Sequence, residues 1–155
     1  MSHSLLVALQ TEIASRCEVT LASHRDWPCR QGCDHCCRSL ARPMELTLAE
    51  WQAIPASAVN HARITDPRVC PFLDTASGAC SIYDRRPLAC RAYGFYVERE
   101  KGLYCAMIRE RVESGEMQDI VWGNGEALEQ RSEPLGPRLT LAQFLELRVT
   151  LANAD

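Results

Sequence analysis

Cysteine is the residue type whose number and spacing give this sequence its chemistry. The chain of 155 residues contains nine cysteines, of which four lie close together and four follow singly. These eight are Cys29, Cys33, Cys36, Cys37, Cys70, Cys80, Cys90 and Cys105. Thiolates separated by two or three residues can converge on one metal centre, as in structural zinc and iron–sulfur sites. The sequence therefore predicts metal binding by these eight cysteines.

The adjacent residues Cys36 and Cys37 are expected to differ in what they bind. Neighbouring side chains on an extended or irregular backbone diverge, so the two sulfurs do not easily complete one tetrahedral ion. We expect Cys29, Cys33 and Cys36 to contribute to one centre and Cys37 to point to a second, with the four later cysteines supplying the other ligands. Two four-thiolate sites or one polynuclear cluster would use all eight cysteines, and one of the adjacent pair could also have another role.

Other residues near the cysteines have more than one interpretation. Cys17 is distant from both groups and lies on a predicted helix, so we interpret it as a small core residue. His35 could replace a cysteine as ligand, although eight thiols already suffice. Gly32 allows the positive φ that a chain wrapping around an ion often needs.

Arginines and tyrosines flank the later cysteines. Seven basic and three acidic residues lie between residues 85 and 111, and guanidinium groups there could offset the charge of thiolates or form a solvated face. Arg86 and Arg91 could donate to thiolate sulfurs, to a carboxylate that braces the loop, or to ordinary ion pairs. Tyr83 and Tyr93 are expected to be core aromatics with anchored hydroxyls.

The elements that must position these cysteines are mainly helices. Apolar side chains recur at helical spacing over residues 4–23 and 140–152, which predicts an amphipathic helix near each end. Capping boxes mark helix starts at Thr47 and Thr140. Pro87 favours a short helix that carries Cys90.

Between the predicted helices we expect short strands and turns. Residues 70–73 and 80–83 are short enough to pair as a hairpin, residues 94–97 can be extended, residues 104–112 are expected to be helical, and residues 123–125 mark a turn. The expected fold is mainly α with a few short strands, an α+β class. We expect one domain over 1–155, with an irregular metal-binding region at about 29–105 between the terminal helices.

Composition and the first residues exclude several classes of protein. The net charge of -3 gives no reason to expect a nucleic-acid partner, and no apolar run is long enough to span a membrane. The N-terminus lacks the pattern of a secretory signal, so we expect a cytoplasmic protein with reduced thiols, and the odd cysteine count fits a disulfide framework poorly. No motif of a hydrolase, nucleotidase or metalloprotease is visible, and no catalytic residue is assigned.

The spacing of the cysteines and their neighbours resembles a known family. The pattern Cys29-x-x-x-Cys33-x-x-Cys36-Cys37, then Cys70-Pro-Phe-Leu, then Cys80-x-Ile-Tyr-x-x-Arg-Pro-x-x-Cys90-Arg-x-Tyr, is similar to the zinc- or iron-chelating cysteine-cluster proteins of the YkgJ type. This resemblance covers roughly residues 29–105. It implies a small bacterial protein with eight metal-binding cysteines and leaves Cys17 outside. The chain is also similar to part of the flagellin lysine methylases.

Two functional classes follow from these observations. In the first, zinc closes all-cysteine sites and the protein is a binding or interaction module, with metal ions and a protein as its partners. In the second, iron and sulfide form a cluster that serves electron transfer, an oxidoreductase or a protein-modification component, which would make the chain part of an enzyme. We expect zinc, because it explains the pattern with fewer components.

Overall fold

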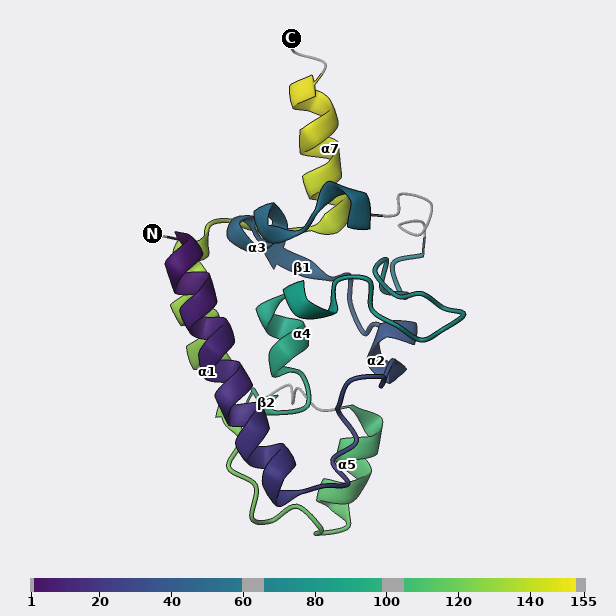
Figure 1. Ribbon diagram of the computed structural model, residues 1–155, viewed down its shortest axis with the longest axis vertical. Helices are drawn as coiled ribbons and strands as arrows, with labels where there is room; N and C mark the ends of the chain where they lie inside the picture. Colours follow the sequence, from purple (N-terminus) through teal and green to yellow (C-terminus); the bar gives the residue numbers. More distant parts are fainter. Residues whose placement is uncertain (1, 60–65, 99–104, 153–155) are drawn as a thin grey trace.

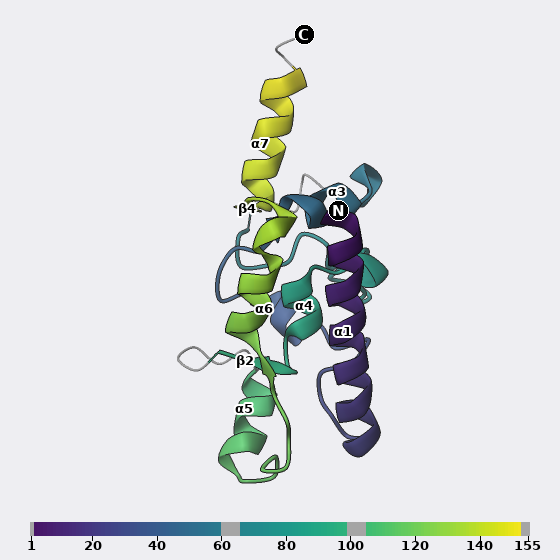
Figure 2. The same ribbon diagram turned by 90° about the vertical axis from the view of Figure 1, so that its left-hand side faces the viewer.

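The computed structural model is rich in helices, with a few short strands in two small sheets (Figures 1 and 2). It describes residues 2–59, 66–98 and 105–152. The α-helices are α1 (Ser2–Ser23), α2 (His35–Arg38), α3 (Leu48–Ala53), α4 (Leu88–Ala92), α5 (Ala106–Glu113), α6 (Gly125–Ser132) and α7 (Leu141–Ala152). The strands are β1 (Glu45–Thr47), β2 (Tyr96–Val97), β3 (Gly123–Asn124) and β4 (Arg138–Thr140). Short 3-10 turns are η1 (Ala56–Ala58), η3 (Tyr83–Arg85) and η4 (Glu133–Leu135). The predicted α+β fold class is confirmed.

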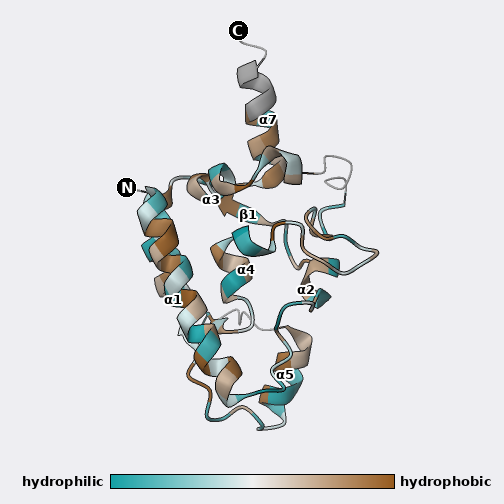
Figure 3. Cartoon of the chain, viewed as in Figure 1, coloured by the Kyte–Doolittle hydropathy of each residue, from teal (hydrophilic) through white to brown (hydrophobic). Residues whose placement is uncertain are grey.

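Helix α1 runs along one side of the molecule and supplies much of its core (Figure 1). Leu6, Leu9 and Ile13 follow helical spacing on one face, and all three are buried. Figure 3 shows hydrophobic and hydrophilic residues alternating along this helix. Because α1 contacts α3, α4, α6 and η4, it orders elements from most of the chain. The predicted N-terminal helix is confirmed, and it begins at Ser2.

A buried carboxylate joins α3 to α4. Thr47 is the N-cap of α3, and its hydroxyl accepts the backbone N–H of Glu50 at 3.4 Å. The Glu50 Oε2 atom accepts from the backbone N–H and the hydroxyl of Thr47, each at 2.7 Å. Its Oε1 atom accepts the backbone N–H of Leu88, the first residue of α4, at 2.6 Å. The capping box is confirmed, and Glu50 also fixes where the helix of Cys90 begins.

Two small sheets join segments that are far apart in sequence. Strand β1 pairs antiparallel with β4, and β2 pairs parallel with β3. In the second sheet Tyr96 lies opposite Gly123, where an added Cβ would come within 2.4 Å of the tyrosine ring. Glycine at this position therefore allows the strands to approach.

The turn predicted for residues 123–125 is wrong. Strand β3 leads directly into α6, and Asn124 is the N-cap of that helix, with its Oδ1 atom accepting the backbone N–H of Ala127 at 3.0 Å. Asparagine is favoured both in turns and at helix N-caps, because its short side chain accepts nearby backbone N–H groups in both. The local sequence does not separate these two structures.

The hairpin predicted for residues 70–73 and 80–83 is confirmed in part. Leu73 and Cys80 form an antiparallel β-bridge, flanked by backbone hydrogen bonds from Ser81 to Phe72 at 2.9 Å and from Asp74 to Ala79 at 2.8 Å, but the segments form no longer strands. The carboxylate of Asp74 accepts the backbone N–H of Ala76 at 3.0 Å and the hydroxyl of Ser77 at 2.8 Å. These side-chain hydrogen bonds shape the tight turn that joins the two segments.

Helix α7 begins at the second predicted capping box. The Gln143 side chain accepts the backbone N–H of Thr140 at 2.8 Å, and the Thr140 hydroxyl accepts the backbone N–H of Gln143 at 3.3 Å. Phe144 is buried and stacks on Trp51, with ring centroids 5.4 Å apart. Leu147 is 51% exposed, and the helix extends away from the body of the protein (Figures 1 and 2). The start of α7 therefore packs in the core through Leu141 and Phe144.

The helix predicted over residues 104–112 corresponds to α5, although residue 104 lies outside the described residues. The extended segment predicted over 94–97 contains the short strand β2. Among the described residues, no helix combines the length and hydropathy that spanning a bilayer requires.

Buried apolar side chains form two clusters. The first cluster packs against α1 and contains Leu6, Leu9, Ile13, Trp27, Ala49, Leu88, Ala92, Phe95, Tyr96, Cys105, Ile108, Met117, Leu128 and Leu135. The second cluster packs beneath α7 and contains Leu46, Trp51, Ile54, Val59, Cys70, Phe72, Leu73, Ile82, Leu141 and Phe144. Cysteines border both clusters, which places the predicted ligands in two different surroundings.

Candidate metal centre

The first cysteines lie on a tight loop between α1 and α2. Arg30 holds this loop, because its Nε atom donates to the backbone carbonyl of Trp27 at 2.8 Å and its own carbonyl accepts the N–H of Cys33 at 3.0 Å. Gly32 has a φ of 92°, which confirms the positive φ expected there. The chain therefore turns sharply between Cys29 and Cys33.

Cys36 and Cys37 lie on α2, a single helical turn, where the sequence predicted an irregular loop. Adjacent residues of an α-helix are rotated by about 100° about its axis, so the Cα–Cβ bonds of Cys36 and Cys37 leave the helix in different directions, although their thiols remain neighbours. An ion pair of 2.6 Å joins Asp34 to Arg38, and Arg38 also donates to the carbonyl of Thr75 at 3.2 Å. These contacts fix α2 against the turn that leads to the later cysteines.

Cys70 and Cys80 are brought to Cys37 by backbone contacts. The N–H of Cys70 donates to the carbonyl of Cys37 at 2.8 Å. The β-bridge between Leu73 and Cys80 then returns the chain to the same place. Cys70 is buried in the second cluster, and Cys37 and Cys80 pack against that cluster.

Cys29 and Cys105 border the first cluster instead. The Cys29 thiol donates to the backbone carbonyl of Tyr93 at 3.2 Å. Gly94 makes this approach possible, because its φ is 85° and an added Cβ would lie 2.8 Å from the Cys29 Sγ atom. Cys105 is buried at the N-terminus of α5.

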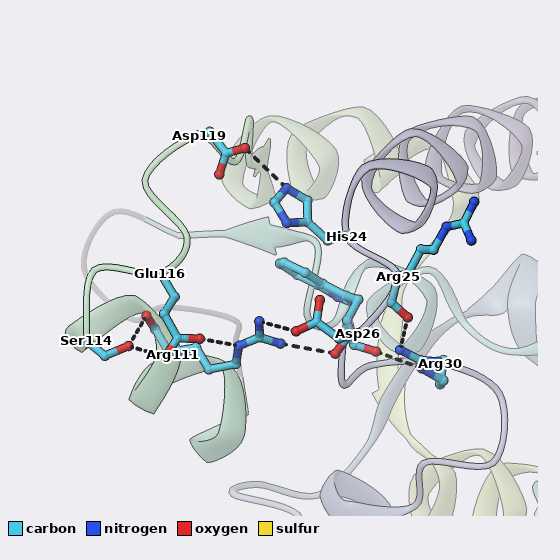
Figure 4. A network of polar contacts seen from close by, with 9 residues as sticks. His24, Arg25, Asp26, Arg30, Arg111, Ser114, Glu116 and Asp119 are labelled. Atoms are coloured by element: carbon cyan, nitrogen blue, oxygen red, sulfur yellow. Dashed lines mark hydrogen bonds and ion pairs between the residues drawn. The ribbon is translucent and has the colours of Figure 1, made fainter.

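A polar network anchors α5 beside the start of the ligand loop (Figure 4). The guanidinium of Arg111 donates to the carboxylate of Asp26 at 2.5 Å and to its backbone carbonyl at 3.1 Å. The same guanidinium pairs with Glu116 at 3.0 Å. Since Asp26 precedes Cys29 and Arg111 follows Cys105 on α5, the network holds these two cysteine-bearing segments together.

One group of thiols is centred on Cys29. Burial, together with the neighbouring thiols of Cys36, Cys33 and Cys105, raises the pKa of the Cys29 thiol to about 12. Burial and the proximity of Cys36, Cys105 and Cys29 likewise raise the pKa of the Tyr93 phenol to about 12. We call Cys29, Cys33, Cys36 and Cys105 the first thiol set.

A second group of thiols surrounds Cys37. Burial, with the neighbouring thiols of Cys37, Cys36 and Cys80, raises the pKa of Cys90 to about 12. For Cys37 a hydrogen bond from Cys36 lowers the pKa, but a hydrogen bond to Cys70, burial and the nearby thiols raise it to about 12. We call Cys37, Cys70, Cys80 and Cys90 the second thiol set.

The two sets meet at the adjacent cysteines of α2. The neighbouring Cys37 thiol, and then burial, raise the pKa of Cys36 above its ordinary value. The thiols of Cys36 and Cys70 are in turn the nearest influences on the pKa of Cys37. Cys36 and Cys37 therefore link the first set to the second.

The donor chemistry of both sets fits a thiophilic metal ion. Each set offers four soft sulfur ligands that are half-buried or buried, and the mutual repulsion of their thiolates is a cost that a bound cation removes. Within the described residues, which include all nine cysteines, no three Cys, His, Asp or Glu side chains form a ready-made ligand set. The sulfurs of a set are thus neighbours without forming a closed tetrahedron.

Cys17 and His35 lie apart from both sets. Cys17 packs against the first cluster, and its thiol lies 3.8 Å from the carbonyl of Arg91, to which it donates. Burial raises the pKa of this thiol to about 11. The side chain of His35 is exposed on α2, away from the buried sulfurs.

Arg86 and Arg91 brace the backbone of the segment around Cys90. Arg86 donates to the carbonyl of Tyr83 at 3.1 Å, and its guanidinium lies 3.9 Å from the centre of the Tyr83 ring. Arg91 donates to the carbonyl of Arg86 at 2.9 Å. Their hydrogen bonds thus differ from the expected ones to thiolates or carboxylates. The charge of Arg86 still opposes the rise in pKa of Cys29 and of Cys90, one member of each set.

Two residues that position the cysteines were missed by sequence reasoning. Glu50 was expected to cap only its own helix, yet it also binds the start of the helix of Cys90. Gly94 was expected only within an extended segment, yet it allows the approach of Cys29. Both contacts join segments far apart in sequence. The one local feature of the sequence that could have indicated either contact is the position of Gly94 between two aromatic residues.

Comparison with known proteins places these cysteines in one family model. Residues 28–126 match CxxCxxCC, described as "Putative zinc- or iron-chelating domain". The matched span contains both thiol sets and leaves out Cys17. No curated protein and no solved structure gave a significant match.

Proposed function

The chain belongs to the CxxCxxCC family of zinc- or iron-chelating domains, and from this membership we propose that it binds two zinc ions as a structural module. One observation carries the proposal: the thiols of Cys33, Cys36 and Cys105 lie near Cys29, those of Cys70 and Cys80 lie near Cys37, and Cys37 and Cys80 lie near Cys90, with Cys36 neighbouring both groups. Four thiolates satisfy a structural zinc ion completely and leave no open position.

In this proposal each thiol set holds one ion. Cys29, Cys33, Cys36 and Cys105 hold the first ion, and Cys37, Cys70, Cys80 and Cys90 hold the second. The assignment is supported by the different clusters that the two sets border. Bound zinc stabilises thiolates and so lowers the effective pKa of its ligands.

The proximity of Cys37 and Cys70 suits two ligands of one metal ion, because the neighbouring Cys70 thiol is among the groups that raise the pKa of Cys37. Thiolates bound to zinc at about 2.3 Å in a tetrahedron lie about 3.8 Å from one another. We propose zinc because it explains the eight-cysteine pattern with fewer components than iron and sulfide do.

Zinc in these sites would join segments that share little regular structure. The ligands of the two sets lie on five segments. These are the loop after α1, helix α2, the segment of residues 70–80, helix α4 and the start of α5. Closed four-thiolate sites supply folding energy and no redox chemistry, so the role we propose is a binding module for a protein partner. Thiolates must stay reduced, and we propose the cytoplasm as the compartment.

The test of metal identity is purification without oxygen, followed by a visible spectrum and measurement of zinc, iron and acid-labile sulfide. We expect a colourless protein with two zinc ions per chain and no sulfide. A brown protein with iron and sulfide would overturn the proposal in favour of an iron–sulfur function in electron transfer or protein modification.

The test of the ligand assignment uses three matched serine variants. Cys36→Ser and Cys37→Ser each remove one ligand, from different sets, so native mass spectrometry should show one tightly held zinc ion in each variant. Cys17→Ser should keep both ions. Full zinc content in Cys37→Ser would contradict the division into two sets.

A further inference from the structure

Cys37 and Cys70 lie far apart in sequence, and a backbone hydrogen bond brings them together. Their main chains are joined by a hydrogen bond of 2.8 Å from the N–H of Cys70 to the carbonyl of Cys37. The Cys70 thiol is near enough to the Cys37 thiol to raise its pKa. Both side chains pack in the second cluster.

This arrangement suits a covalent bond between the two sulfurs. A single backbone hydrogen bond of this length brings the two Cα atoms to roughly 5–6 Å of one another, a separation like that of hydrogen-bonded strand residues. A disulfide requires a Cα separation of about 4.4–6.8 Å, so the backbone needs no large movement. The adjacent pair on α2 lacks this fit, because neighbouring Cα atoms are only about 3.8 Å apart.

The two thiols also differ in access to a small oxidant. Cys37 is half-buried and Cys70 is 6% exposed. Cys37 is therefore the more accessible of the two sulfurs, and a sulfenic acid formed on it would lie beside the Cys70 thiol, with which it can condense. Because the raised pKa of Cys37 leaves little thiolate at neutral pH, this oxidation is slow.

We propose that Cys37 and Cys70 are a redox modification site, at which hydrogen peroxide converts the two thiols of the metal-free protein into a disulfide. Peroxide first oxidises the Cys37 sulfur to sulfenic acid and is reduced to water. The Cys70 sulfur then attacks the Cys37 sulfur, the S–O bond breaks, and a second water leaves. In sum, two thiols and one hydrogen peroxide give one disulfide and two waters.

The bond would couple the oxidation state of the protein to its metal capacity, a consequence that rests on the proposed function. A disulfide between Cys37 and Cys70 removes two of the four ligands of the second thiol set and none of the first. Oxidation should therefore lower the zinc capacity from two ions to one. Bound zinc should in turn protect the pair from peroxide, because both sulfurs are then engaged.

The experiment treats the full-length, metal-free chain with one equivalent of hydrogen peroxide, alkylates it and digests it with trypsin without reduction. Cleavage at the arginines separates a peptide of residues 31–38 from one of residues 69–85. We expect these two peptides to be linked as the main product. A main product that links other peptides, or none at all, would overturn the inference.

Single variants identify which cysteines form the link. Cys36→Ser and Cys80→Ser should keep the link between the two peptides, and Cys17→Ser should have no effect. Cys37→Ser should abolish it, and persistence of the link in that variant would refute the proposed pair. The cross-link is measured without metal, so its outcome is independent of the proposed zinc function, which the metal analysis tests separately.

Discussion

The two thiol sets are held by different kinds of structure. Cys29 and Cys105 of the first set border the cluster built on α1, and Arg111 ties α5 to the segment that precedes the loop. In the second set Cys37 lies on a single helical turn, while Cys70 and Cys80 lie on a tight turn closed by one β-bridge. The first set is therefore supported by helices and the second mainly by turns.

This difference shows where a metal ion would contribute most. A helical core can fix its cysteines through packing, because a buried apolar side chain contributes about 1.5–3 kcal/mol. The segment that carries Cys70 and Cys80 buries Phe72 and Leu73, but its described residues form no helix and one β-bridge, so its cohesion depends more on cross-links. We therefore expect the second set to depend on metal more than the first does.

The largest expected effect is that of metal removal. Chelation should lower the free energy of unfolding by more than about 5 kcal/mol, since structural zinc contributes apparent binding energies of about 10–16 kcal/mol in small domains. Amide hydrogen exchange should rise most over residues 66–81 and least in α1. Equal loss of protection in both regions would contradict the comparison.

Removal of the buried carboxylate of Glu50 should have the next largest effect. Glu50→Ala leaves the backbone N–H groups of Thr47 and Leu88 without their acceptor, and we expect a loss of roughly 3–5 kcal/mol in urea unfolding. Because α4 carries Cys90, the second set should lose zinc before the first. Glu18→Ala, at an exposed site on α1, should change stability by less than about 0.5 kcal/mol.

A substitution at Gly94 should act on the first set. Gly94→Ala combines an unfavourable φ of 85° with a contact of 2.8 Å to the Cys29 Sγ atom, and we expect a cost of roughly 2–4 kcal/mol. The matched control is Gly115→Ala, where φ is 82° but the nearest atom is a flexible glutamine end, with an expected cost of about 1–2 kcal/mol. If thermal unfolding shows the same loss of stability for both variants, the close approach of Cys29 to Gly94 does not contribute to the cost.

The smallest expected effect is the pH dependence of the α5 anchor. Hydrogen bonding to Arg111 holds the pKa of Asp26 below its ordinary value. A carboxylate with a lowered folded pKa stabilises the protein above its unfolded pKa of about 3.9, and this contribution is lost as pH falls through the folded pKa. Metal-free Asp26→Asn should therefore be less stable than the parent at pH 6, and the difference should shrink near pH 3. A difference that is the same at both pH values would contradict this role.

Much of the fold could be predicted from local patterns. The amphipathic terminal helices and both capping boxes follow from side-chain spacing and from hydrogen bonds over three residues, which the sequence displays directly. The hairpin at residues 70–83 formed only as one β-bridge and the turn at Gly123 was wrong, because Asp74 and Asn124 can serve several local structures. Tertiary contacts select among these structures, and a single sequence does not reveal such contacts.

By itself the sequence determined the chemistry of this protein: eight cysteines whose spacing and neighbours identify a metal-chelating family, and one more cysteine on an N-terminal helix. Only the tertiary structure decided which thiols are neighbours. Cys105 lies with Cys29, and Cys70 lies with Cys37, although each pair is separated by more than thirty residues. The physical reason is that thiol chemistry resides in single side chains, whereas proximity depends on packing, on buried groups such as Glu50 and Gly94, and on the helical turn that directs Cys36 and Cys37 apart.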